Sequence, residues 1–116
     1  MNFVEAPAGY RCGIYSDPNY VVHRWNVPFV EVYFSSTRKG GSMFCHLASD
    51  KTGLRLLKDA ISEYTEYLFT RYPWCTMVIA TVNRKSLARL LEKCGFERIK
   101  PIGSGYVYVR LKEWVL

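Results

Sequence analysis

The sequence predicts an α/β (α+β) fold in which a mixed sheet packs against two main helices. Three observations lead to this prediction. Cys75–Val82 contains an unbroken run of apolar and β-branched residues, which is typical of a strand buried on both faces. Apolar residues recur at helical spacing before and after that strand, and segments rich in aromatic and β-branched residues nearer the N-terminus favour strands. The predicted order is β-β-β-α-β-α-β-β.

The first part of the chain is expected to form three strands after an irregular start. Residues 1–19 contain two prolines and two glycines, and only Arg11–Tyr15 among them suggests a short strand. The three strands expected next are Tyr20–Trp25, Phe29–Phe34 and Ser42–Ser49. The polar, glycine-ended stretch Ser35–Gly41 predicts the loop of a hairpin between the last two.

Apolar residues spaced three and four apart predict a long amphipathic helix over Thr52–Arg71. These residues are Leu54, Leu57, Ile61, Tyr64 and Leu68. Asp50 or Thr52 can cap the first turn of this helix, and Pro73 marks its end.

A second helix is predicted directly after the buried strand. Its apolar stripe consists of Leu87, Leu90, Leu91 and Cys94. Gly95 can adopt the left-handed conformation that ends a helix, and Phe96 is then expected to pack onto the core. Glu97–Pro101 and Gly105–Leu111 follow, and the alternation in the second of these predicts a half-buried strand.

Composition limits the class of protein. A chain of 116 residues, 49% hydrophobic and 22% charged, predicts a single globular domain over residues 1–116 and no membrane protein. The N-terminus lacks the pattern of a secretory signal, so we expect the cytoplasm. The four cysteines form no C-x-x-C pair, which favours buried thiols over a disulfide and predicts no metal site. The net charge of +6 favours an anionic partner.

The stretch from Asn83 to Phe96 carries a family resemblance. A buried strand followed by Asn83, a helix and the sequence Leu-Leu-Glu-Lys-Cys-Gly-Phe at positions 90–96 resembles the second half of the GNAT superfamily of N-acetyltransferases. The resemblance covers residues 28–111. It implies a mostly antiparallel sheet in which Ser42–Ser49 and Cys75–Val82 splay apart, with the pantetheine arm of acetyl-CoA inserted between them.

The resemblance also implies which residues bind coenzyme A. The pyrophosphate would meet the start of the long helix, where free backbone N–H groups and the helix dipole favour negative charge. The implied cofactor-binding residues are Leu47, Ser49, Lys51, Thr52, Gly53, Leu54, Arg55, Asn83, Arg84 and Lys85.

Two positions depart from the family pattern. At the start of the long helix the family has Arg or Gln, then glycine and a small residue, whereas this chain has Asp50, Gly53 and Arg55. Asp50 would repel phosphate, and Arg55 replaces the residue that lets the backbone approach closely. Nearby cations can compensate, or can simply form the solvated start of a surface helix. Leu91 stands where many members have a tyrosine that protonates the leaving thiolate.

Acetyl transfer to an amine needs a base that takes a proton from the attacking nitrogen. Alternation along Ser42–Ser49 places His46 on one face with Phe44 and Ala48, and Glu31 falls on the neighbouring predicted strand. We therefore predict His46 and Glu31 as the candidate catalytic residues. The alternative is that His46 has a structural role at the sheet and that Glu31 is a charged edge residue.

Three functions remain open on the sequence. The first is an acetyl-CoA-dependent N-acetyltransferase that acts on an amine of unknown identity, in a small molecule or a protein. The second is a catalytically degenerate GNAT-fold protein that acts as a binding or virion component, because its compact layout is similar to that of small bacteriophage GNAT-like proteins. The third is nucleic-acid binding through Arg38-Lys39 and Arg84-Lys85-Arg89, which lacks the clustered aromatics expected of such a surface.

A homodimer is expected for a packing reason. The family usually has two helices before most of its strands, whereas about twenty residues precede the first clear strand here. One sheet face would then be covered by residues 1–19 or by a second copy of the chain. The predicted face carries an aromatic patch made of Tyr20, Trp25, Tyr33, Tyr106, Tyr108 and Trp114.

Overall fold

The protein is described by a computed structural model that covers residues 2–6, 18–102 and 105–113. The short strand predicted at Arg11–Tyr15, and the predictions for Cys12 and Trp114, lie outside these residues. The elements follow the predicted order, with one more strand in front. They are β1 (Phe3–Glu5), β2 (Val21–Trp25), β3 (Val32–Lys39), β4 (Ser42–Ser49), the 3₁₀ turn η1 (Gly53–Leu56), α1 (Leu57–Arg71), β5 (Met77–Val82), α2 (Lys85–Lys93), β6 (Glu97–Ile102) and β7 (Gly105–Leu111).

The described strands form one seven-stranded sheet in the spatial order β1-β2-β3-β4-β5-β7-β6. Every neighbouring pair is antiparallel except β4 and β5, which run parallel. The predicted mixed, mostly antiparallel sheet is therefore confirmed. Parallel neighbours need a crossover connection, and α1 provides it.

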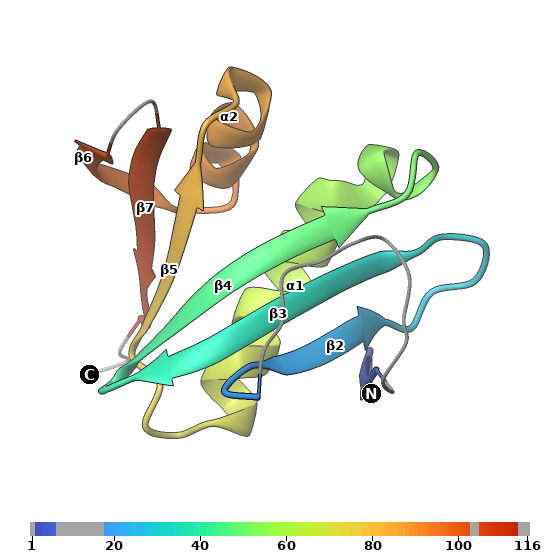
Figure 1. The fold of residues 1–116 in the computed structure, drawn as a ribbon, viewed down its shortest axis with the longest axis horizontal. Coiled ribbons are helices and arrows are strands. Elements are labelled where there is room, and N and C mark those ends of the chain that lie inside the picture. The colour runs from blue at the N-terminus through green and yellow to red at the C-terminus, as the bar shows by residue number, and fades with distance from the viewer. Residues whose placement is uncertain (1, 7–17, 103–104, 114–116) are drawn as a thin grey trace.

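The parallel pairing of β4 with β5 is short. Ser42–Cys45 pairs with Met77–Ala80, and the ladder then ends. Beyond that point β4 continues along β3 to Ser49, while β5 continues along β7 to Val82. Figure 1 shows the two strands diverging toward the end of the molecule that carries α2. The predicted splaying of the central strands is confirmed.

The hairpin of β3 and β4 differs from the prediction at both ends of β3. The strand expected over Phe29–Phe34 begins only at Val32, and it runs through the expected loop to Lys39. A two-residue turn follows, in which Gly40 has φ +63°, a conformation that favours glycine. The polar start of the expected loop, Ser35 and Ser36, is part of β3, and both serines are fully buried.

The start of the chain is more regular than predicted. Phe3–Glu5 forms β1 and pairs with His23–Trp25 of β2, so the expectation of an irregular segment is wrong for these three residues. Phe3 anchors them, because its ring lies 5.9 Å from that of Phe34 and 5.1 Å from that of Tyr64. A strand of three residues is too short to show a periodic pattern in the sequence.

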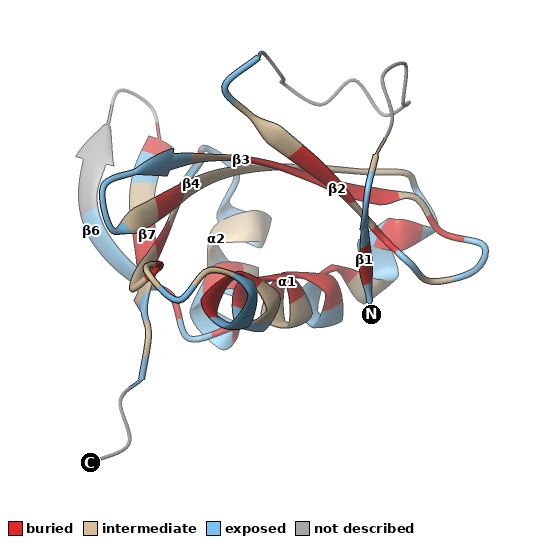
Figure 2. Cartoon of the chain, turned by 90° about the horizontal axis from the view of Figure 1, so that it is seen from below, coloured by how far each residue is buried: buried red, intermediate tan, exposed pale blue. Residues whose placement is uncertain are grey.

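Both described helices lie on the same face of the sheet (Figure 2). The predicted stripe on α1 is buried from Leu57 onward, at Leu57, Ile61, Tyr64 and Leu68. Leu54 is 56% exposed, because the predicted first turn of the helix is the 3₁₀ turn η1. The predicted end of α2 is confirmed, since Gly95 has φ +88° and Phe96 is buried. Among the described helices, none is long and apolar enough to cross a membrane.

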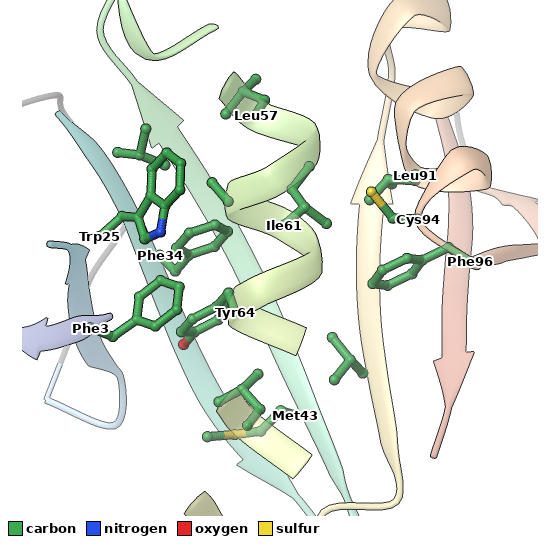
Figure 3. Close-up of a cluster of buried hydrophobic side chains, with 14 of the residues drawn as sticks. Phe3, Trp25, Phe34, Met43, Leu57, Ile61, Tyr64, Leu91, Cys94 and Phe96 are labelled. Atoms are coloured by element: carbon green, nitrogen blue, oxygen red, sulfur yellow. The ribbon is translucent and has the colours of Figure 1, made fainter. Parts of the chain in front are cut away.

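The buried residues form one core cluster, in which Figure 3 shows Phe3, Trp25 and Phe34 on one side of α1 and Leu91, Cys94 and Phe96 on the other, beside β5. The N-terminal half, defined as β1–β4 with α1, buries Phe3, Trp25, Phe34, Met43, Leu57, Ile61 and Tyr64. The C-terminal half, defined as β5–β7 with α2, buries Val78, Val82, Leu91, Cys94, Phe96 and Tyr108. The two halves meet along the parallel pairing and through the Cys94 thiol, which lies 3.5 Å from the Lys58 carbonyl oxygen.

The predicted aromatic patch is not an exposed surface. Trp25, Tyr33 and Tyr108 are only 3%, 5% and 2% exposed, and Tyr20 is half-buried. Tyr106 is exposed on the face that carries the helices, in register with Val82. Trp25, Tyr33 and Tyr108 are buried inside the fold, so the patch prediction is wrong for these three rings, while the homodimer stays a prediction.

Candidate functional site

The divergence of β4 and β5 creates the candidate site. Its inner end lies at Cys45 and Ala80, the last residues paired between the two strands. From His46 onward the β4 backbone keeps its ladder with β3 but has none with β5. Such strand edges present backbone N–H and C=O groups to whatever enters between them.

An inner cavity of about 380 Å³ begins at this divergence. Strand residues and the facing sides of both helices line it, and most of the lining is apolar. The lining residues are Phe34, Cys45, His46, Leu47, Ala48, Ile61, Tyr64, Thr65, Val78, Ala80, Thr81, Val82, Leu87, Leu91 and Phe96. The volume is in the range of small-molecule sites.

An outer cavity of about 640 Å³ adjoins the inner one, and a larger share of its lining residues is polar or charged. Leu47 and Leu87 line both cavities, so the two adjoin each other between the ends of β4 and β5, and together they are called the cleft. The remaining lining residues are Ser49, Leu54, Leu57, Asn83, Arg84, Ser86 and Leu90. The cleft therefore has an apolar interior and a mouth with amide, hydroxyl and guanidinium groups.

The structure brings some of the predicted site residues together at this cleft and leaves others outside. Those that line it are His46, Leu47, Ser49, Leu54, Asn83 and Arg84. The predicted residues that do not line it are Glu31, Lys51, Thr52, Gly53, Arg55 and Lys85. Glu31 precedes β3, and its carbonyl oxygen accepts the Asp50 N–H at 2.8 Å.

His46 lies on the face of β4 opposite the helices. Its β4 neighbours Cys45 and Leu47 belong to the core on the helix side, and side chains alternate along a strand. The His46 ring lies 5.6 Å from Tyr20 and 5.8 Å from Phe44. Partial burial lowers the pKa of His46, so its imidazole is neutral at pH 7 and can accept a proton.

Asp50 lies just before the 3₁₀ turn η1, and its carboxylate Oδ1 accepts the Gly53 N–H at 2.6 Å. The N-cap residue of η1 is the other candidate, Thr52, which makes no side-chain cap hydrogen bond, and α1 itself begins after Leu56. A Cβ atom at Gly53 would lie 2.4 Å from Ser49 Oγ and 2.7 Å from Val32 Cγ2. Glycine is therefore required there for packing against the ends of β3 and β4.

The predicted basic clusters lie at opposite ends of the central strands. Arg38 and Lys39 precede the β3–β4 turn, where the Arg38 guanidinium lies 3.8 Å from the centre of the Trp74 ring. Arg84 and Lys85 follow β5 at the mouth of the cleft. The two clusters are thus separated by the length of β4 and β5, and nucleic-acid binding through them stays untested.

Comparison with known proteins finds a similar fold but no similar sequence. No family model and no curated protein matches the sequence. Among solved structures, AAC(6')-Ib in complex with ribostamycin and coenzyme A aligns with a TM-score of 0.67 over 81% of this chain at 18% identity. A mutant of the spermidine N-acetyltransferase SpeG from Vibrio cholerae aligns with a TM-score of 0.63 over 82% at 13% identity. A GNAT-family acetyltransferase from Bacillus anthracis aligns with a TM-score of 0.60 over 80% at 16% identity.

This chain has the GNAT fold. The element order and the divergent parallel pair agree with the resemblance carried by residues 83–96. The chain spans 65%, 67% and 66% of the lengths of those three structures. Leu91 is buried and lines the inner cavity.

Sequence reasoning missed a buried chain of polar groups next to the inner cavity. The Ser36 hydroxyl donates to Cys45 Sγ at 3.2 Å and lies 2.6 Å from the Tyr64 hydroxyl. His23 follows, with Nδ1 3.3 Å from the Tyr64 hydroxyl and Nε2 3.4 Å from that of Tyr67. These partners come from four separate elements, so no local sequence pattern could have revealed them.

Burial fixes the protonation of this polar chain. It raises the pKa of the Cys45 thiol to about 12, although the Ser36 hydrogen bond opposes the shift. It also raises the pKa of Tyr64 and lowers that of His23. All three groups are therefore neutral at pH 7, and Cys45 is an unreactive thiol at the base of the cleft.

Proposed function

We propose that this protein is an N-acetyltransferase that transfers an acetyl group from acetyl-CoA to an amine. One observation carries the proposal: β4 and β5 pair over four residues and then diverge around a cleft with an apolar interior and a polar mouth. The GNAT fold alone would not support it, because one fold can serve many functions.

The residues at the cleft fit a pantetheine thioester. The edges of β4 and β5 offer backbone groups to the amides of the arm, and the apolar interior suits its methylene and methyl groups. Asn83, Ser49 and Arg84 at the mouth suit the polar end of the cofactor. When bound, acetyl-CoA supplies an activated acetyl group as a thioester.

His46 is the base in this proposal. The amine nitrogen attacks the thioester carbonyl carbon, a C–N bond forms, and the C–S bond breaks with its electron pair leaving on sulfur. Neutral His46 takes the proton that the nitrogen loses, directly or through water. Leu91 has no proton to give, so the thiolate takes its proton from solvent.

Calorimetry with acetyl-CoA tests the binding step. We expect binding that weakens with added salt, because Arg84 is exposed and salt screens exposed charges. Ala80→Leu should weaken it about tenfold or more by filling the inner cavity, since ligand sites need matching space. Ala88→Leu makes the same change on α2 outside the cleft lining and should leave binding unchanged. No heat at millimolar acetyl-CoA would refute the proposal.

Release of free thiol in the presence of an amine panel tests the chemical step. We expect His46→Gln to slow the release about a hundredfold, the usual scale for loss of a general base. Glu31→Gln, outside the cleft lining, serves as the matched control and should retain the rate. Binding of acetyl-CoA without any turnover would favour the alternative of a catalytically degenerate binding protein.

A further inference from the structure

The inner cavity extends past the point where β4 and β5 part. Their ladder ends at Cys45 and Ala80, yet Val78, which lines the cavity, pairs with Met43 inside the ladder. Two residues of a strand, from Ala80 to Val78, rise by about 7 Å. Part of the cavity therefore runs along the paired portion of β5, on the side of the sheet that carries the helices.

The residues that α1 contributes show the same depth. Leu57 lines the outer cavity, whereas Ile61, Tyr64 and Thr65 line the inner one, so the lining follows α1 inward from the mouth of the cleft. Figure 3 shows the Ile61 side chain directed toward the space between α1 and β5. The part of the cavity lined by Val78, Tyr64 and Thr65 is called the inner end, because these residues lie farthest from the mouth on β5 and α1.

The polar groups at the inner end already have partners inside the protein. The Thr65 hydroxyl donates to the Ile61 carbonyl oxygen at 2.8 Å, and the Tyr64 hydroxyl lies 2.6 Å from that of Ser36. Among the described residues that line the inner cavity, none is Lys, Arg, Asp or Glu. A charge buried there would have no partner of opposite sign, which is costly. The inner end therefore suits an apolar group.

An acetyl group is too short to use this space. The strand edges that suit the pantetheine arm end at Cys45 and Ala80, so the thioester at the end of the arm would face the inner end. Acetyl has one carbon beyond its carbonyl, whereas two residues of extended chain, or six backbone atoms, span about 7 Å. His46 lies on the opposite face of β4, so a longer acyl chain at the inner end would not displace the base.

We propose that the protein prefers a donor whose acyl group is an apolar chain of about four to six carbons, with its end held at Val78, Tyr64 and Thr65. This inference rests on the proposed transferase function and names its acyl class, of which acetyl is the shortest member. Each methylene buried at the inner end adds affinity, because apolar surface leaves water. A chain that ends in a carboxylate is rejected, because that charge would be buried without a cation.

The experiment is calorimetry of the wild-type protein with coenzyme A thioesters of graded chain length. We expect butyryl-CoA to bind about tenfold more tightly than acetyl-CoA, because two more methylenes are buried. Hexanoyl-CoA should bind at least as tightly as butyryl-CoA, and decanoyl-CoA should gain nothing further over hexanoyl-CoA. Succinyl-CoA matches butyryl-CoA in chain length but ends in a carboxylate, so it should bind no more tightly than acetyl-CoA.

Two variants locate the effect at the inner end. Val78→Phe fills this space and should remove the gain in affinity from acetyl-CoA to butyryl-CoA. Ile79→Phe is the matched control, because Ile79 is the next residue of β5, points to the other face and lies outside the cleft lining. It should keep the wild-type gain. Circular dichroism checks that both variants fold, and the wild-type series is decisive without them.

The outcomes distinguish this inference from the function on which it rests. If acetyl-CoA binds and butyryl-CoA binds equally or more weakly, the inner end takes no acyl chain and the inference is wrong, although the transferase proposal stands. Tighter binding of butyryl-CoA that persists in a folded Val78→Phe variant also overturns it, because the chain then lies elsewhere. If no thioester of the series binds, the proposed function is refuted and the inference with it.

Discussion

Both halves of the molecule line the inner cavity, but the N-terminal half also buries Phe3, Trp25 and Leu68 away from the cleft, whereas the buried side chains of β5 and α2 line it. In the N-terminal half the Phe34 and Tyr64 rings stack at 4.1 Å, and Phe3 contacts both edge-on. In the C-terminal half, Val78, Leu91 and Phe96 are buried residues that also line the inner cavity.

This difference separates the support of the fold from the site. Residues enclosed by the core, such as Leu68, touch neighbours on every side. The residues that line the cavity lack neighbours on one side, and that missing contact is the space for a ligand. The site therefore lowers the packing energy of the residues that border it.

The largest expected effect tests this contrast directly. Leu68→Ala should lower the free energy of unfolding by about 2–5 kcal/mol, the range for a buried leucine. Leu91→Ala, with 3% exposure against 0% for Leu68, should fall at the low end of that range, because Leu91 lines the inner cavity and Leu68 does not. Urea unfolding followed by circular dichroism measures both. An equal or greater loss for Leu91→Ala would contradict the comparison.

A smaller effect is expected from the polar groups buried in the N-terminal half. Tyr64→Phe removes the hydroxyl between Ser36 and His23 and should cost about 1–3 kcal/mol, since it leaves buried polar partners unsatisfied. Tyr67→Phe removes a longer contact, 3.4 Å, from a half-buried residue and should cost less. The same unfolding assay ranks the two variants, and the reverse order would refute this account.

The pH dependence of stability should also come from the N-terminal half, which contains both histidines of the sequence. Burial lowers the pKa of His23, with Glu5 opposing and Arg71 adding to the shift, and burial lowers the pKa of His46. The unfolded chain then binds protons below about pH 6.5 that the folded chain does not, so stability is fully present above that pH and falls as the pH decreases.

Unfolding free energies at pH 7.5 and pH 6.0 test this sign. We expect a lower unfolding free energy at pH 6.0 than at pH 7.5. The difference should be smaller in His46→Gln, because only His23 then contributes to the pH dependence. Equal stability at the two pH values would show that neither histidine is held neutral by the fold.

The smallest effect is expected at the surface contact between the halves. Arg110 of β7 and Glu66 of α1 form an ion pair at 2.7 Å, with side chains 19% and 64% exposed. Glu66→Gln should cost less than about 1 kcal/mol, and less again in high salt, because exposed pairs are screened. Asp59→Asn on the same helix is the control. A cost of several kcal/mol would mean that this pair, and not core packing, holds the halves together.

The sequence predicted those parts of the fold that repeat a local pattern. The stripe of α1 and the Gly95 stop of α2 follow from spacing and from glycine's backbone freedom, and both are confirmed. The polar stretch at Ser35–Ser36 was misread as a loop, because its hydroxyls are buried and Ser36 finds its partners Tyr64 and Cys45 far away in the chain. Tertiary partners of this kind leave no local trace.

The candidate site also contains residues that the sequence predicted and contacts that it did not. His46, Asn83 and Arg84 were predicted from strand alternation and family resemblance, and the structure places them along one cleft. For Asp50 the sequence left two readings, a helix cap and a charge that would repel phosphate. The hydrogen bond from the Gly53 N–H to its carboxylate could be seen only in the structure.

The short parallel pairing has a consequence for the order in which the chain folds. Ser42 pairs with Met77, and the whole of α1 lies between them in the sequence. Forming this contact therefore costs the entropy of closing a long loop before the contact energy is gained. The β3–β4 hairpin and the β6–β7 hairpin join residues much closer in sequence. We expect both hairpins to form early and the β4–β5 contact to form late, so that the cleft is the last part of the molecule to be assembled.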